Sequence, residues 1–190
     1  MHEYDQIAEW FTRVRNPEIG IPDLVAFVQS LSPHAKILDL GCGDGIPISQ
    51  YLFREKFDLV GLDSSQEMIK RYRANFPTIP TRCERAQEAR FMPGSFDAVV
   101  AWSVLFHLSD TEQASLIAKV AGWLKPDGRF LFTSGDVEGV AEGEMNGISF
   151  AYVSLGSSTY RCLLHGAKMR VLAVYSDPWE NHVYIAQKIA

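Results

Sequence analysis

The stretch Ile37-Leu-Asp-Leu-Gly-Cys-Gly-Asp-Gly45 decides the fold. Its first half extends an apolar run that begins at Lys36, as in a buried strand, and the run stops at a cluster of glycines. The following stretch, 46–55, predicts a helix. A strand that ends in a glycine-rich turn before a helix is typical of a parallel sheet that binds its ligands at the carboxyl ends of the strands.

The same alternation of apolar runs and amphipathic stretches continues along the chain. Ser64 with Glu67, and Ser109 with Glu112, match the capping box that opens a helix. Residues 125–128 predict a turn with Pro and Gly, and 136–144 a polar loop. The order of elements predicts an α/β fold with a parallel sheet covered on both faces. Further strands are predicted at 57–62, 78–83, 96–102, 129–133, 169–175 and 182–189, and further helices at 64–75, 109–123 and 157–166.

Two helices are predicted before the first strand, at 4–11 and 23–31. The first carries Tyr4 and Phe11 on one face, at helical spacing. A packing helix and a lid over a bound ligand explain this pattern equally well. We expect one domain over residues 1–190, with 1–31 as N-terminal helices or lid and 35–190 as the core.

Composition narrows the class of protein. The chain has 190 residues, a net charge of −5 and a hydrophobic fraction of 47%. That size suits one core, and the acidic balance argues against a nucleic-acid partner. Three widely spaced cysteines form neither a disulfide framework nor a metal-ligand pattern. The acidic N-terminus is unlike a signal peptide, and no run is long enough to span a membrane. We therefore expect a cytoplasmic protein without a bound metal.

The chemistry of the glycine loop favours a zwitterionic or cationic ligand. The spacing is Gly-x-Gly-x-Gly, whereas a dinucleotide-binding turn has Gly-x-Gly-x-x-Gly. Asp39 and Asp44 flank or interrupt the glycines, and no Lys or Arg occurs between Ile37 and Phe53. Carboxylates repel a phosphate and attract a sulfonium or ammonium group. Asp63, at the end of the second predicted strand, is placed to accept hydrogen bonds from ribose hydroxyls.

Four ordered blocks resemble the class I SAM-dependent methyltransferases, where SAM is S-adenosylmethionine. The resemblance runs from about 35 to 133 and is looser to residue 188. It implies a three-layer, Rossmann-like fold with a seven-stranded sheet whose last strand is antiparallel. The blocks are Ile37-Leu-Asp-Leu-Gly-Cys-Gly-Asp-Gly45, Leu59-Val-Gly-Leu-Asp-Ser-Ser-Gln-Glu-Met68, Gly94-Ser-Phe-Asp-Ala-Val-Val100 and Leu124-Lys-Pro-Asp-Gly128.

The resemblance also implies a set of SAM-binding residues. The glycine loop would wrap the methionine part, with Asp39 supporting the loop and the ammonium group. Asp63 would hold the ribose. Further residues that contact the adenine and the sulfonium would lie just after the third and fourth predicted strands. The family often has an Asp where this chain has Arg85, which leaves the adenine amino contact unassigned. The implied residues are Asp39, Gly41, Cys42, Gly43, Gly45, Asp63, Ser64, Met68, Ala86, Gln87, Trp102 and Ser103.

The acceptor side offers one acid–base candidate, His107, just past the fourth strand. A structural histidine that holds a loop is the alternative. The acidic residues of 136–144 fit a solvated mobile loop or an anionic rim that attracts a cationic acceptor. We expect methyl transfer to a nitrogen or oxygen of a small molecule, by a monomer or homodimer. A SAM-binding protein without catalysis and an NAD-dependent oxidoreductase remain as alternatives.

Overall fold

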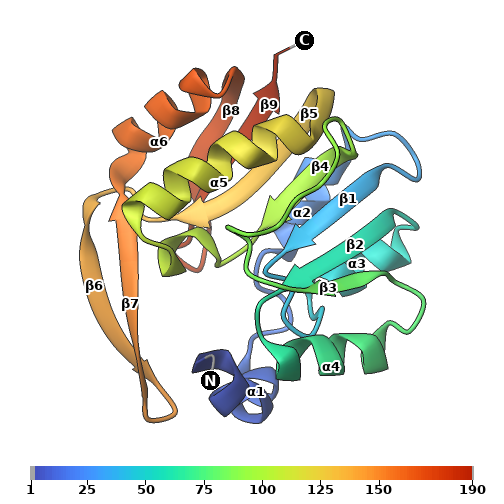
Figure 1. Cartoon of the computed structure of the whole chain (residues 1–190), viewed down its shortest axis with the longest axis vertical. Helices are drawn as coiled ribbons and strands as arrows, with labels where there is room; N and C mark the ends of the chain where they lie inside the picture. Colours follow the sequence, from blue (N-terminus) through green and yellow to red (C-terminus); the bar gives the residue numbers. More distant parts are fainter. Residues whose placement is uncertain (1–2, 190) are drawn as a thin grey trace.

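The computed structural model describes residues 3–189 and contains a seven-stranded sheet (Figure 1). The strand order is β3-β2-β1-β4-β5-β9-β8. β9 runs antiparallel to both of its neighbours, and the other pairs are parallel. The predicted α/β, Rossmann-like sheet with an antiparallel last strand is therefore confirmed. The strands are β1 Lys36–Leu40, β2 Asp58–Asp63, β3 Thr81–Cys83, β4 Phe96–Ala101, β5 Leu124–Ser134, β8 Met169–Ser176 and β9 His182–Lys188.

Helices cover both faces of this sheet and make it the middle of three layers (Figure 1). Successive side chains of a strand point to opposite faces. Leu38 of β1 accordingly packs in one buried cluster with α5 and α6, and Ile37 packs in another with α2, α3 and α4. Both predicted N-terminal helices are present. The helices are α1 Glu3–Val14, α2 Ile21–Val28, α3 Ile48–Arg54, α4 Gln66–Asn75, α5 Asp110–Trp123 and α6 Gly156–Gly166, with the short 3-10 helix η1 Leu105–His107.

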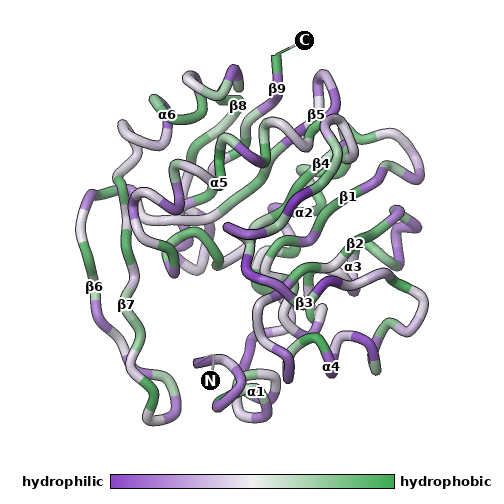
Figure 2. The backbone as a smooth tube through the Cα atoms, in the orientation of Figure 1, coloured by the Kyte–Doolittle hydropathy of each residue, from purple (hydrophilic) through white to green (hydrophobic). Residues whose placement is uncertain are grey.

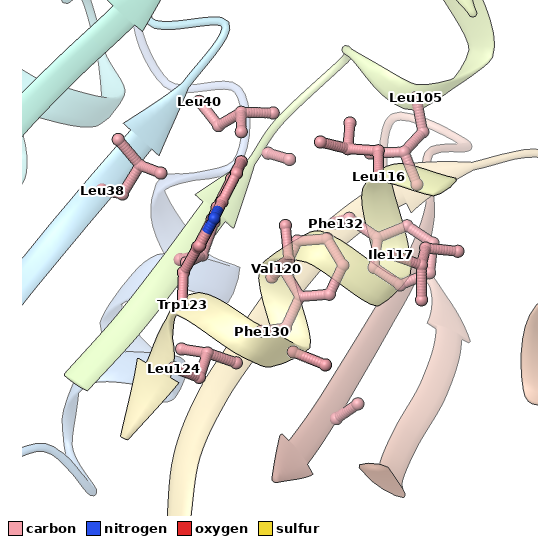
Figure 3. Packing of buried hydrophobic residues seen from close by; sticks show 14 of the residues in the cluster. Leu38, Leu40, Leu105, Leu116, Ile117, Val120, Trp123, Leu124, Phe130 and Phe132 are labelled. Atoms are coloured by element: carbon pink, nitrogen blue, oxygen red, sulfur yellow. The ribbon is translucent and has the colours of Figure 1, made fainter. Parts of the chain in front are cut away.

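A buried cluster beneath α5 packs the layer formed by α5 and α6 against the centre of the sheet. Trp123, Val120 and Ile117 of α5 meet Phe130 and Phe132 of β5 there (Figure 3). In Figure 2 the central strands are predominantly hydrophobic, in agreement with their burial on both faces. The aromatic side chains of this cluster each contribute about 3–5 kcal/mol relative to alanine. This packing holds the central strands in place, and with them the edge of the sheet formed by their carboxyl ends.

Two helix starts were predicted as capping boxes, and one is confirmed. The Ser109 side chain accepts from the backbone of Glu112, whose carboxylate accepts the N–H of Ser109. At α4, however, the N-cap is Ser65, one residue after the predicted Ser64. Asp5 of α1 explains the difference, because its carboxylate accepts from both the Ser65 hydroxyl and the Glu67 backbone. Ser64 is thereby left outside the helix.

The predicted turn at 125–128 lies within β5. Strand pairing jumps from Leu124 to Arg129 opposite β4, and Asp127 between them has φ of 62°. The four intervening residues therefore bulge out of the ladder while the strand continues on either side. The Pro and Gly of this segment therefore interrupt a strand, whereas the sequence predicts that they precede one.

The predicted polar loop at 136–144 is wrong, because this segment opens a β-hairpin. β6, Glu138–Met145, pairs antiparallel with β7, Ile148–Leu155, in a separate two-stranded sheet. Asn146 and Gly147 join the strands with φ of 51° and 79°, as in the favoured two-residue hairpin turns. Glycines and glutamates give β6 a low strand propensity and a mixed colour pattern (Figure 2).

Candidate functional site

The glycine loop after β1 turns back on β2 through unusual backbone geometry. Gly41 and Gly43 have φ of 74° and 55°, values that side chains other than glycine rarely adopt. The N–H groups of Gly41 and Cys42 both donate to the Leu62 carbonyl, at 2.7 and 3.0 Å. A Cβ at Gly41 would lie 2.2 Å from Cγ2 of Val104. The loop therefore has to be glycine at this position.

Asp63, the last residue of β2, holds the loop from the neighbouring strand. Its Oδ2 accepts the backbone N–H of Gly43 at 2.8 Å, and its Oδ1 accepts that of Ser65 at 2.8 Å. One carboxylate thus joins the glycine loop to the segment that leads into α4. Each carboxylate oxygen has two lone pairs and can accept more than one hydrogen bond, from ribose hydroxyls among other donors.

These groups open into a cavity of about 740 Å³, here called the loop cavity. Its volume lies within the range of small-molecule sites. It contains ten of the thirteen residues that the sequence analysis assigned to the site. Those ten are Gly41, Gly43, Asp63, Ser64, Met68, Ala86, Gln87, Trp102, Ser103 and His107.

Asp39, Cys42 and Gly45 do not line the loop cavity. Asp39 is 2% exposed and its carboxylate accepts from the Ser49 hydroxyl at 2.6 Å, behind the loop. Burial raises the pKa of Asp39 to about 6, partly opposed by that hydrogen bond. A Cβ at Gly45 would meet the ring of Phe76, so this glycine faces the core. Asp39 thus accepts a hydrogen bond from the helix that follows the loop, and none of these three residues lines the loop cavity.

The far wall of the loop cavity follows β3. Gln87 donates to Oε1 of Glu112 at 2.9 Å, and Arg85 pairs with the same oxygen at 3.2 Å. The hydrogen bond from Gln87 is the main reason why the pKa of Glu112 is lowered. Arg85, which stands where the family often has Asp, therefore joins a charge-paired network with the start of α5.

Arg15 is a site residue that the sequence analysis missed. It follows α1, lines the loop cavity and has its guanidinium carbon 5.4 Å from the ring centre of Phe11. An ideal Cβ on Gly43 would lie 4.0 Å from its Nη1. Burial lowers the pKa of Arg15, and the carboxylates of Asp44 and Asp39 act in the opposite direction. The loop thus faces one guanidinium as well as carboxylates, which no local motif indicated.

A second cavity, about 770 Å³ in volume, adjoins the first and is called the hairpin cavity. Residues of the β6–β7 hairpin, of the end of β5 and of the start of β9 line it. Both cavities share a boundary. The residues that line both are Tyr4, Phe11, Arg15, Ser103 and His107.

His107 stands at this shared boundary, surrounded by aromatic rings. The Tyr4 hydroxyl lies 3.1 Å from its Nε2. The rings of Phe106, Phe150 and Tyr152 have centres 4.8, 5.9 and 5.4 Å from the imidazole. α1, η1 and β7 thus meet around one histidine, and its role as an acid–base residue stays a prediction.

Glu138, Glu142 and Glu144 alternate along β6 and therefore lie on the same face of the hairpin. Glu142 pairs with Ala151 and Glu144 with Ser149, whereas Tyr152 pairs with Ala141 on the other face. Glu138 lines the hairpin cavity, and Glu142 and Glu144 do not. The predicted anionic rim is therefore reduced to Glu138 on this strand.

Within residues 3–189, no group of three or more His, Cys, Asp or Glu side chains is arranged to hold a metal ion. None of the helices in that part of the chain is long and apolar enough to cross a membrane. Cys42, Cys83 and Cys162 are all free thiols.

Sequence comparison identifies a methyltransferase domain over residues 37–128. An uncharacterized methyltransferase of Synechocystis is 34% identical over 101 residues, covering 53% of this chain and 47% of that protein. The ubiquinone biosynthesis O-methyltransferase of Yersinia enterocolitica is 33% identical over 104 residues, covering 52% and 42%. The chain therefore matches less than half the length of these relatives.

Structural similarity extends over nearly the whole chain. The CcbJ methyltransferase of Streptomyces caelestis superposes with a TM-score of 0.81 at 16% identity, covering 99% of this chain and 98% of that one. At this level of identity the likeness concerns the fold. It includes the segments outside 37–128, among them the N-terminal helices.

Proposed function

The chain belongs to the class I, Rossmann-like SAM-dependent methyltransferases, and from this premise we propose that it methylates a nitrogen or oxygen atom of a small molecule. The observation that carries the proposal is the pairing of Asp63 with the Gly43 backbone at the mouth of the loop cavity. This carboxylate lies beside the glycine turn, a position that supports a role in accepting hydrogen bonds from ribose hydroxyls.

The residues present fit SAM. Asp63 would hold the ribose, and Ser64, Met68 and Ala86 would flank the adenine. Arg15 would pair with the carboxylate of the methionine part, since a guanidinium binds a carboxylate strongly. The ammonium group would lie in the negative field of Asp39 and Asp44 behind the loop.

When bound, SAM supplies an activated methyl group: the acceptor atom forms a bond to the methyl carbon as the carbon–sulfur bond breaks, and the electron pair stays on sulfur. The protein has to align the acceptor and exclude water, and such positioning lowers a barrier by ~7–11 kcal/mol. Ser103 and His107 line both cavities, so the acceptor and the methyl donor would meet beside them.

We further propose that residues 1–190 form a single catalytic domain, active in the cytoplasm as a monomer or homodimer and without a nucleic-acid or membrane partner. Residues 1–2 and 190 of this range lie outside the described residues. The proposal includes a covering role for α1, because Tyr4 and Phe11 line the loop cavity.

A thermal-shift comparison of SAM, S-adenosylhomocysteine and NAD tests the proposed cofactor. At 100 times its dissociation constant, a ligand stabilises the folded protein by ~2.7 kcal/mol. We expect both sulfur compounds to raise the melting temperature and NAD to leave it unchanged. Stabilisation by NAD alone would instead support an oxidoreductase.

A further inference from the structure

We propose that the hairpin cavity binds an uncharged compound that carries a hydroxyl group on a flat aromatic ring, and that Tyr4 and His107 take up the hydroxyl proton. This inference rests on the proposed function, since it names the acceptor that the enzyme would methylate. The two cavities share Tyr4, Ser103 and His107. A molecule in the hairpin cavity therefore reaches the loop cavity at these residues.

The charges around the hairpin cavity disfavour an anionic acceptor. Within residues 3–189, Arg15 is the only Lys or Arg that lines it, and this guanidinium already faces Asp39 and Asp44. Glu138 and Glu180 line the same cavity. A phosphate or carboxylate would lose its hydration and gain two like charges nearby. An uncharged acceptor avoids this cost.

The apolar walls favour a hydrophobic ring. Val137 and Val140 line the cavity and are 72% and 68% exposed. Phe106 and Tyr152, also in the lining, lie edge to face with their ring centres 5.6 Å apart. Apolar side chains exposed together beside a cavity are typical of a binding surface. A flat ring would cover the valines and pack against the two aromatic side chains.

The Tyr4–His107 hydrogen bond distinguishes a hydroxyl acceptor from an amine. A neutral amine attacks a methyl donor without help, whereas a hydroxyl gains from proton removal. Burial is the main cause that raises the pKa of Tyr4, followed by the nearby Tyr152. Tyr4 therefore stays protonated and serves as a relay: its oxygen receives the acceptor proton while its own proton passes to Nε2 of His107, 3.1 Å away.

Three matched probes test the acceptor class, namely 4-propylphenol, 4-propylaniline and 3-(4-hydroxyphenyl)propionate. Their binding to protein saturated with S-adenosylhomocysteine is measured by calorimetry, and methyl transfer from tritiated SAM is measured separately. We expect the phenol to bind and to be methylated on oxygen, and the propionate to bind at least tenfold more weakly. The aniline, whose neutral nitrogen attacks without proton removal, is the control whose rate should not depend on the relay.

Three results would overturn the inference: equal binding of the propionate, methylation of the aniline but not the phenol, or no binding of the phenol. If S-adenosylhomocysteine itself does not bind, the proposed function fails instead.

Two variants test the location and the relay. Gly139 lines the hairpin cavity and an added Cβ meets nothing within 4 Å, so Gly139→Leu should fill the cavity. Gly122 on α5 is equally unobstructed and lines neither cavity, which makes Gly122→Leu the matched control. We expect Gly139→Leu to weaken binding of 4-propylphenol at least tenfold, and both variants to keep the wild-type affinity for S-adenosylhomocysteine. Unchanged phenol binding in Gly139→Leu would place the acceptor elsewhere.

Tyr4→Phe keeps the ring packing and removes the hydroxyl. Phenol binding should remain within about threefold of wild type, while the rate of methylation at saturating phenol falls by roughly 10²-fold or more. A wild-type rate in this variant would refute the relay, because a purely structural Tyr4 needs only its ring.

Discussion

Oδ2 of Asp63 accepts the backbone N–H of Gly43 at 2.8 Å, across the gap between β2 and the loop after β1. Because Oδ1 of the same carboxylate accepts from Ser65, the loop and the entry to α4 are fixed to one side chain. A residue expected to bind ribose thus also shapes the turn expected to bind the methionine part. Changes at Asp63 should therefore affect the whole cofactor.

Arg15→Met should weaken binding of S-adenosylhomocysteine about tenfold or more, because it removes a charge-assisted contact to the carboxylate. Binding of 5′-methylthioadenosine, which lacks the amino-acid part, should not change. Both are measured by calorimetry, with Arg13→Met as the control, since Arg13 is an exposed arginine two residues earlier, at the end of α1. An equal loss for both ligands would show that Arg15 acts on the fold and not on the carboxylate.

Asp39→Asn should stabilise the cofactor-free protein at neutral pH. Burial raises the pKa of Asp39 to about 6 in the folded protein, from an ordinary value of 3.8. Folding therefore disfavours the ionised form, and the wild type loses stability as the pH rises from about 4 to 6. The expected gain is about 2–3 kcal/mol at pH 7 and near zero at pH 4, by urea unfolding. If the gain in stability were the same at pH 4 and pH 7, it could not come from the ionised Asp39 carboxylate.

Ser109→Ala should lower the free energy of unfolding by about 1 kcal/mol, because it removes half of the capping box at the start of α5. Thr111→Ala, two residues on at an exposed position, should have less than half of that effect. Urea denaturation of the two variants decides between a specific cap and a general preference for helix formation. Equal losses would argue against the cap.

The sheet and the cofactor loop could be predicted from sequence because their signals are local. The apolar run ending at Gly41 and the acidic end of the next strand each mark a strand terminus, and parallel pairing brings the two ends together. Ile37 pairs with Leu59 in that register, and so Asp63 reaches the loop.

The hairpin and Arg15 could not be predicted in the same way. Because β6 contains several glycines and glutamates, it lacks the alternation of apolar residues that predicts a strand. Asn146-Gly147 is nevertheless a typical hairpin turn sequence. Arg15 reaches the loop only through the packing of α1 on α4, where Asp5 caps the helix through Ser65. Contacts between elements so far apart in the chain leave no periodic pattern.

The cofactor role of Asp63 is tested most directly by titrating SAM into wild-type protein and into Asp63→Asn, with Asp58→Asn at the exposed start of the same strand as control. In Asp63→Asn, the side-chain NH2 would face the backbone N–H of Gly43 or Ser65, so one hydrogen bond would be lost. A hydrogen bond to a charged group is worth ~1.5–3 kcal/mol. We predict saturable binding by the wild type and the control, and affinity about 10- to 100-fold weaker for Asp63→Asn. Equal affinity in all three proteins, or no uptake by the wild type, would contradict the account.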